Sequence, residues 1–182
     1  MARDGMHDPA SRQGENRLPA IRIREDVSGL SVAATLVEDR APANAAFLWD
    51  FFAIPRKIPA IHAMWTGPEI SAPIPDGALT EAQRVAGLPL ENATIMPQPG
   101  DVVLTFLPPR VWGGGPAPVF DIGLFYGPGA RLFFPIGWQP GSVAARISDV
   151  SSFAAACGRI RQRGACVLVF EREPAAGGGD HL

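Results

Sequence analysis

Residues 20–37 read AIRIREDVSGLSVAATLV, and this stretch predicts how the fold begins. In residues 20–24 apolar and charged side chains alternate, which is the pattern of a strand with one buried face. Residues 26–29 form a turn, and the apolar residues 30–37 then form a second strand. The segment therefore predicts a β-hairpin.

Two helices are expected outside this hairpin. Pro42 suits the first turn of a helix that extends to about Phe52, and its aromatic side chains cover more than one face. We expect these rings to lie in the core, against a sheet. The second helix is capped by Asp149 or Ser151, carries one apolar face and ends before Gly164.

The other apolar segments predict strands separated by turns. The expected strands are residues 60–65, 69–74, 102–107, 119–126, 131–134, 143–147 and 166–170. Strands 119–126 and 131–134 are expected to pair as a hairpin. A short helical turn capped by Thr80 and a Gly/Pro-rich loop at 108–118 complete the pattern. Eight or nine short strands without βαβ alternation favour a mainly β fold, a closed or nearly closed barrel.

Composition limits the class of protein. The chain has 182 residues, 16 Lys and Arg against 18 Asp and Glu, and a formal net charge of −2. This length favours one domain, and the charge gives no basic surface for nucleic acid. The absence of an apolar stretch of about 20 residues predicts no membrane span. With 20 Gly and 19 Pro, turns should be frequent.

The ends of the chain differ from its middle. Residues 1–18 are polar and residues 174–182 are rich in Gly, so we expect flexible tails around a domain at 19–173. The N-terminal tail has no apolar region of the kind found in signal peptides, which predicts a cytoplasmic protein. His7 and His181 fall in these tails and are not candidate site residues.

Several kinds of chemistry are not expected. Gly113-Gly114-Gly115 precedes a proline instead of the helix that a phosphate-binding loop needs, and Lys57 is the only lysine. Cys157 and Cys166 lie in apolar segments and are interpreted as inert core thiols. His62 is the only histidine in the domain. We therefore expect no metal site and no cofactor.

The candidate site centres on residues 60–69, AIHAMWTGPE. Strand alternation puts His62 on the face opposite Trp65, so His62 is interpreted as a structural, hydrogen-bonded imidazole unless a bulge turns it. Glu69 is the candidate catalytic acid or base. The expected binding residues are Trp65, Arg131, Trp112 and Trp138, which combine aromatic surface with a guanidinium group. Glu69 could equally be a solvated charge, and Arg131 a barrel-edge charge.

The order of segments resembles known proteins. Glu38 to Pro42, followed by a helix with Asn44 and Phe47 and then by Ile61-His62, looks like the opening of cyclophilins. The chain also resembles an uncharacterised bacterial family with a cyclophilin-like barrel. The motifs that carry this resemblance are residues 61–67 (IHAMWTG), 99–101 (PGD), 122–127 and 131–133 (RLF). It covers about residues 20–172 and implies an eight-stranded barrel capped by two α-helices.

The resemblance also bears on function. Cyclophilins have their catalytic arginine directly after Phe-His, where this chain has Ala63, whose side chain cannot donate a hydrogen bond. The same fold occurs in subunits of enzymes that open cyclic amides. We therefore expect a pocket that binds or processes a small polar metabolite, a cyclic amide or a carboxylate. The alternatives are a peptide-binding module or weak peptidyl-prolyl isomerase, and a self-associating protein that pairs through barrel edges or loop 108–118.

Overall fold

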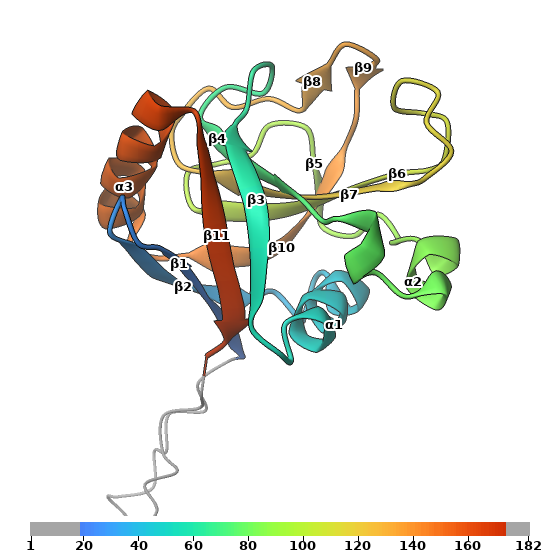
Figure 1. Ribbon diagram of the computed structural model, residues 1–182, viewed down its shortest axis with the longest axis horizontal. Helices are drawn as coiled ribbons and strands as arrows, with labels where there is room; N and C mark the ends of the chain where they lie inside the picture. Colours follow the sequence, from blue (N-terminus) through green and yellow to red (C-terminus); the bar gives the residue numbers. More distant parts are fainter. Residues whose placement is uncertain (1–18, 174–182) are drawn as a thin grey trace, which may run out of the picture.

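The computed structural model describes residues 19–173, so both predicted tails lie outside the described residues. Eight antiparallel strands form a barrel (Figure 1), and it is closed because β10 pairs with β2. Around the barrel the order is β2 (Leu30–Leu36), β1 (Ala20–Glu25), β11 (Ala165–Arg172), β3 (Arg56–His62), β4 (Glu69–Pro73), β7 (Val119–Phe125), β6 (Asp101–Leu107) and β10 (Gly141–Ile147). The predicted mainly β, closed eight-stranded barrel is confirmed.

The barrel interior holds the main hydrophobic core. Alternate side chains of each strand point inward, as Phe120, Ile122 and Leu124 do on β7, and all three are buried. The rings of Phe52 and Phe170 stack in this core with their centroids 4.8 Å apart. The aromatic residues around Phe52 therefore pack as predicted.

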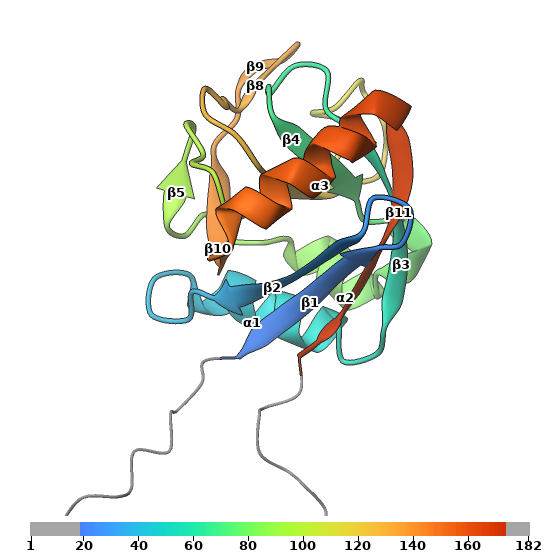
Figure 2. The ribbon, with the colours of Figure 1, turned by 90° about the vertical axis from the view of Figure 1, so that its left-hand side faces the viewer.

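The two long helices cover the barrel core, because the buried faces of α1 and α3 belong to the same hydrophobic cluster as the inward strand residues. Figures 1 and 2 show α1 and α3 at different places around the barrel, and α3 contacts β2, β11 and β3. Within residues 19–173, none of the helices has the length and apolar character needed to cross a bilayer. The helical elements are α1 (Pro42–Phe51), a 3-10 turn η1 (Asp76–Ala78), α2 (Glu81–Ala86) and α3 (Val150–Arg163).

Both predicted long helices are confirmed, as is the short helix capped by Thr80. The Asp149 carboxylate accepts a hydrogen bond from the Ser152 N–H at the start of α3, and Gly164 ends this helix with φ +84°. Its buried face holds Cys157, whose pKa burial raises to about 12. The other thiol, Cys166, is half-buried on β11.

Strand β3 differs from the prediction of residues 60–65 because it begins at Arg56 and ends at His62. Pro59 lies inside this strand. The His62 N–H donates to Gly164 O on the β11 side, so by alternation the Pro59 nitrogen points to the opposite side. There β4 pairs only with Ile61 and His62, and no hydrogen bond is lost at Pro59.

The expected hairpin between residues 119–126 and 131–134 is wrong. Both edges of β7 are occupied, one by β4 and the other by β6. Residues 131–134 instead lead into β8 (Phe133–Phe134), which pairs with β9 (Gly137–Trp138) in a separate two-stranded sheet.

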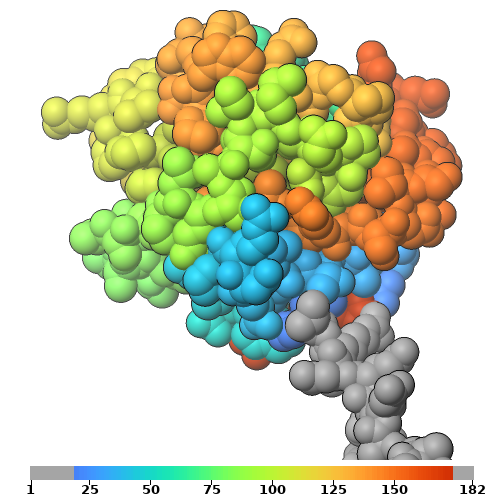
Figure 3. Space-filling model, turned by 180° about the vertical axis from the view of Figure 1, so that it is seen from behind, coloured from blue at the N-terminus to red at the C-terminus, as the bar shows by residue number. Residues whose placement is uncertain are grey.

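A segment of residues 89–95, which we call the strap, crosses the outside of the barrel. Figure 3 shows the surrounding yellow-green region against α1. Near its middle lies the short strand β5 (Ala93–Thr94), which pairs with β10. The Glu91 N–H donates to Ser142 Oγ (3.0 Å), and at the far end the Leu132 N–H donates to Ile95 O (2.9 Å). The strap therefore connects α1, β10 and the loop before β8.

Glu91 caps α1 from a distant part of the sequence. The N-cap residue of α1 is Ala41, whose side chain cannot accept a hydrogen bond. The Glu91 carboxylate accepts instead from the N–H groups of Ala43 (3.3 Å) and Asn44 (3.0 Å), and from Asn44 Nδ2 (2.9 Å). Burial opposes ionisation here, but these hydrogen bonds hold the pKa of Glu91 below its usual value.

We predict that Glu91→Ala lowers the free energy of unfolding by about 1–2 kcal/mol, the usual effect of losing a helix cap. Because the pKa of Glu91 is lowered in the folded state, this contribution should disappear as the pH falls below about 4. Urea unfolding at pH 7 and pH 3 measures both effects. Glu38→Ala, at an exposed position, is the matched control, and an equal loss in both variants would contradict the cap.

Candidate functional site

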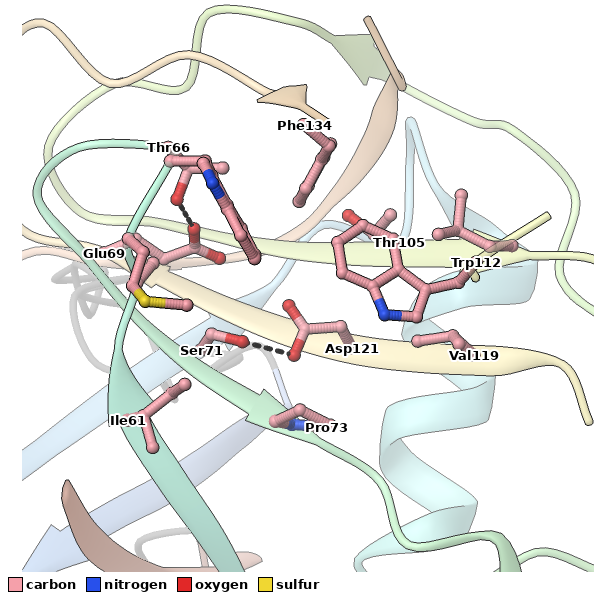
Figure 4. A pocket seen from close by; sticks show the side chains of 14 residues that line it. Ile61, Thr66, Glu69, Ser71, Pro73, Thr105, Trp112, Val119, Asp121 and Phe134 are labelled. Atoms are coloured by element: carbon pink, nitrogen blue, oxygen red, sulfur yellow. Dashed lines mark hydrogen bonds between the residues drawn. The ribbon is translucent and has the colours of Figure 1, made fainter. Parts of the chain in front are cut away.

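The main cavity lies on the outer face of the barrel wall. The outward residues of β4, β6 and β7 form its floor, and the loops at 63–68 and 108–118, together with Phe134, form its sides and roof (Figure 4). Its volume is about 310 Å³. The lining residues are Ile61, Ala63, Met64, Trp65, Thr66, Glu69, Ser71, Pro73, Thr105, Leu107, Trp112, Val119, Asp121 and Phe134.

A second, smaller hydrophobic core supports the loops beside this cavity. It lies outside the barrel and joins strand residues to buried loop residues. Phe134 packs against it. Its members are Val103, Phe125, Ala130, Leu132 and Val143. Of the parts that cover the cavity, this core therefore anchors the segment that carries Phe134.

Two carboxyl groups from neighbouring strands face the cavity. Glu69 begins β4 and is only 3% exposed, while Asp121 lies on β7 beside it. The Thr66 hydroxyl donates to Glu69 Oε2, and the Ser71 hydroxyl donates to Asp121 Oδ1 (2.8 Å). Figure 4 shows both hydrogen bonds and both carboxyl groups directed into one space.

Gly123 makes room for the Glu69 carboxyl group. It is the outward position of β7 next to Asp121, and a Cβ atom there would lie 2.4 Å from Glu69 Oε1. It would also lie 2.8 Å from the Phe125 ring. Since real Cβ contacts are not this short, only glycine allows Glu69 to lie across the strand.

The environment raises the pKa of both acids. Burial, assisted by the charge of Asp121, raises the pKa of Glu69 to about 8, against the lowering effect of the Thr66 hydrogen bond. Burial also raises the pKa of Asp121 to about 6, against the hydrogen bond from Ser71. Both shifts favour the protonated forms, and a protonated carboxyl group can donate as well as accept a hydrogen bond.

Aromatic side chains form one side of the cavity. The rings of Trp65 and Trp112 meet edge to face with centroids 5.7 Å apart, and Trp112 meets Phe134 in the same way at 5.9 Å. Trp112 comes from the predicted Gly/Pro-rich loop, which folds back toward the barrel. Trp65 remains 43% exposed, with Met64 beside it at the mouth.

The structure brings three of the predicted site residues together: Glu69, Trp65 and Trp112 all line the cavity. Arg131 does not line it: its side chain is exposed, and only its backbone N–H reaches this region, donating to Thr66 O (3.0 Å). Trp138 packs on Phe133 (5.0 Å) in the β8–β9 sheet, also outside the lining.

His62 also lies outside the cavity. Its Nε2 is hydrogen-bonded to the Tyr126 hydroxyl (2.8 Å), while its neighbours Ile61 and Ala63 line the cavity. Burial and the nearby charge of Arg161 lower the pKa of His62, which favours the neutral ring. Trp65 lies beyond the end of β3, so strand alternation does not relate its direction to that of His62.

The part of the chain in the structure has no group of three or more His, Cys, Asp or Glu side chains arranged to hold a metal ion. The family model described as a protein of unknown function, DUF3830, matches residues 23–171. This chain belongs to the DUF3830 family. The expected membership of an uncharacterised family is thus confirmed. A search of curated proteins found nothing similar to this DUF3830 member.

Two solved structures resemble the DUF3830 barrel. McbB, solved in complex with tryptophan, has a TM-score of 0.60 and 18% identity over 87% of this chain and 46% of McbB. The chain thus spans about half the length of McbB, and at this identity the likeness concerns the fold. A hypothetical protein from Archaeoglobus fulgidus, solved in solution, has a TM-score of 0.47 and 23% identity, over 88% of this chain and 99% of that one.

Sequence analysis of this DUF3830 chain missed Asp121, Ser71 and Thr66. Asp121 carried a usable signal, because it is the only charge in the apolar strand sequence VFDIGLF. Ser71 and Thr66 carried none, since a lone hydroxyl is common on strands and turns. Their roles depend on the pairing of β4 with β7.

We predict that Glu69→Gln makes the free energy of unfolding of this protein depend less on pH. A carboxyl group whose pKa is raised by folding stabilises the protein at low pH, and this contribution is lost as the pH rises from about 4 toward 8. Urea unfolding should show the wild type losing stability over this interval, and Glu69→Gln losing at least about 1 kcal/mol less. Parallel curves for both proteins would contradict the buried, protonated carboxyl group; exposed Glu38→Gln is the control.

We also predict that His62 stabilises the fold through its hydrogen bond with Tyr126. His62→Ala should cost about 1–3 kcal/mol, because the half-buried Tyr126 hydroxyl loses its hydrogen bond to the imidazole, and His62→Gln should cost less. The double variant with Tyr126→Phe should cost less than the sum of the single variants in a chemical-denaturation cycle. Additive losses would show that the two side chains are not coupled.

Proposed function

We propose that the cavity binds a small molecule with a flat ring and a polar edge, and that Glu69 exchanges a proton with it. The observation that carries this proposal is the pair of carboxyl groups, Glu69 and Asp121, facing a cavity with aromatic walls. Pockets of this size with apolar walls and a few convergent polar groups are typical ligand sites.

The two kinds of surface have separate roles. The Trp65 and Trp112 rings offer faces and edges to a flat apolar group, which supplies binding energy. The carboxyl pair offers several acceptor oxygens and, when one acid is protonated, an O–H donor, which suits a cyclic amide or another group with N–H donors. A carboxyl group with a pKa near neutrality is also suited to general acid–base catalysis.

The carboxylate class of ligand has less support. Its expected partner was Arg131, whose guanidinium group is outside the cavity lining. A ligand carboxylate would instead meet two acids. McbB was solved with tryptophan, a small molecule that joins a flat ring to an amino group and a carboxylate, so this neighbour supports a small ring-bearing ligand without separating the two classes.

Distant kinship with cyclophilins is part of the proposal, and it rests on the order of the sequence segments. Prolyl isomerisation is not part of it. Ala63 stands where cyclophilins have their catalytic arginine, and it lines the cavity without any donor group in its side chain. A binding site for a small molecule fits the enclosed acids better than a surface for an extended peptide.

We predict that Trp112→Ala weakens ligand binding about tenfold or more, since a ring that stacks on the ligand is lost. Ligands are found first by thermal-shift screening of cyclic amides, amines and small carboxylates, and titrations are then followed by tryptophan fluorescence. Trp138→Ala is the matched control because it removes the same ring outside the cavity. Equal affinity of the wild type and Trp112→Ala for every ligand found would overturn the proposal, as would a screen without ligands.

A further inference from the structure

The two carboxyl groups leave two oxygens for a ligand. Thr66 and Ser71 occupy Glu69 Oε2 and Asp121 Oδ1. Within the described residues, Glu69 Oε1 and Asp121 Oδ2 accept no hydrogen bond from the protein, and neither atom is completely buried. In Figure 4 these oxygens point into the space between β4 and Trp112.

Within residues 19–173, no ion pair joins a Lys, Arg or His side chain to Glu69 or Asp121. Of the fourteen residues that line the cavity, none is Lys, Arg or His. Carboxyl groups withdrawn from water are costly unless they are paired or protonated. A cation could also lie against the rings of Trp65, Trp112 and Phe134, which surround the space beside the acids.

From this geometry we infer that the ligand is an organic cation, an amine attached to a flat ring, whose ammonium group lies between Glu69 Oε1 and Asp121 Oδ2. This inference rests on the proposed function and narrows its ligand class. A metal ion is the less suitable cation, because the described residues contain no cluster of three metal-binding side chains. The ammonium group has enough N–H donors for both oxygens, and the ring contacts the tryptophans.

Binding of such a ligand displaces a proton. The amine arrives protonated, and its charge favours the ionised form of Glu69, so the Glu69 O–H bond breaks and the proton goes to the buffer. Glu69 and Asp121 are the charged groups facing this space from β4 and β7, and the 63–68 and 108–118 loops add none to the lining. Binding should therefore release up to one proton per ligand at neutral pH.

Three compounds with the same ring and linker test this inference. Tryptamine, tryptophol and indole-3-propionate join an indole ring to a cationic, a neutral and an anionic end group. Tryptamine should bind about tenfold more tightly than tryptophol, and indole-3-propionate should bind most weakly. Isothermal titration calorimetry in phosphate and Tris buffers measures affinity together with proton release.

Variants that remove one carboxylate charge test whether Glu69 and Asp121 cause the amine preference and the proton release. Asp121→Asn keeps the side-chain size and should abolish the preference of the wild type for tryptamine over tryptophol, and Glu69→Gln should abolish proton release. Asp39→Asn, at an exposed position away from the cavity, should change neither. Melting temperatures establish that each variant is folded, and the wild-type comparison of the three compounds stands without any variant.

The failures of the two proposals are distinguishable. If the three compounds bind with equal affinity, or indole-3-propionate binds best, the ligand is not a cation, although the cavity is still a ligand site. If none binds, the series is repeated with phenethylamine, 2-phenylethanol and 3-phenylpropionate. If neither ring series prefers the amine, the inference is overturned. The proposed function is tested separately, by the thermal-shift screen and the Trp112→Ala variant.

Discussion

The contact between the Glu69 carboxyl group and Gly123 is the constraint on which the site depends. A polar side chain lies flat on the outside of the barrel wall only because the neighbouring strand has no side chain at that point. The loops that cover this spot exclude water from it, and exclusion of water raises the pKa of the acid. The close contact with Gly123 therefore both fits the Glu69 side chain against the wall and places its carboxyl group where its pKa is raised.

The division between barrel and loops explains how one small chain combines stability with a ligand cavity. The interior of the barrel is filled with aliphatic and aromatic side chains and needs no polar groups. The cavity is placed outside it, where the smaller core around Val103 and Phe125 fixes the segment that carries Phe134. The polar groups of the site therefore do not interrupt the packing that holds the strands together.

Local sequence patterns were sufficient for much of the fold. The alternation in β1, the caps of α2 and α3, and the apolar face of α3 depend on residues close in sequence, and each was predicted. The strand around Pro59 and the partner of residues 131–134 depend on which edge is already occupied, which no local pattern records. Trp65, Trp112 and Glu69 were predicted as site residues, but Asp121 joins them only through strand pairing.

The strap gives the molecule a property that neither the barrel nor the cavity has alone. It is bonded to the first turn of α1 through Glu91, to β10 through Ser142, and to the loop before β8 through the Leu132 N–H. The same short segment therefore joins the loop that leads to Phe134, at the cavity, to the first turn of α1, which no molecule in the cavity would touch. Local unfolding of the strap would free both of these parts of the structure at once.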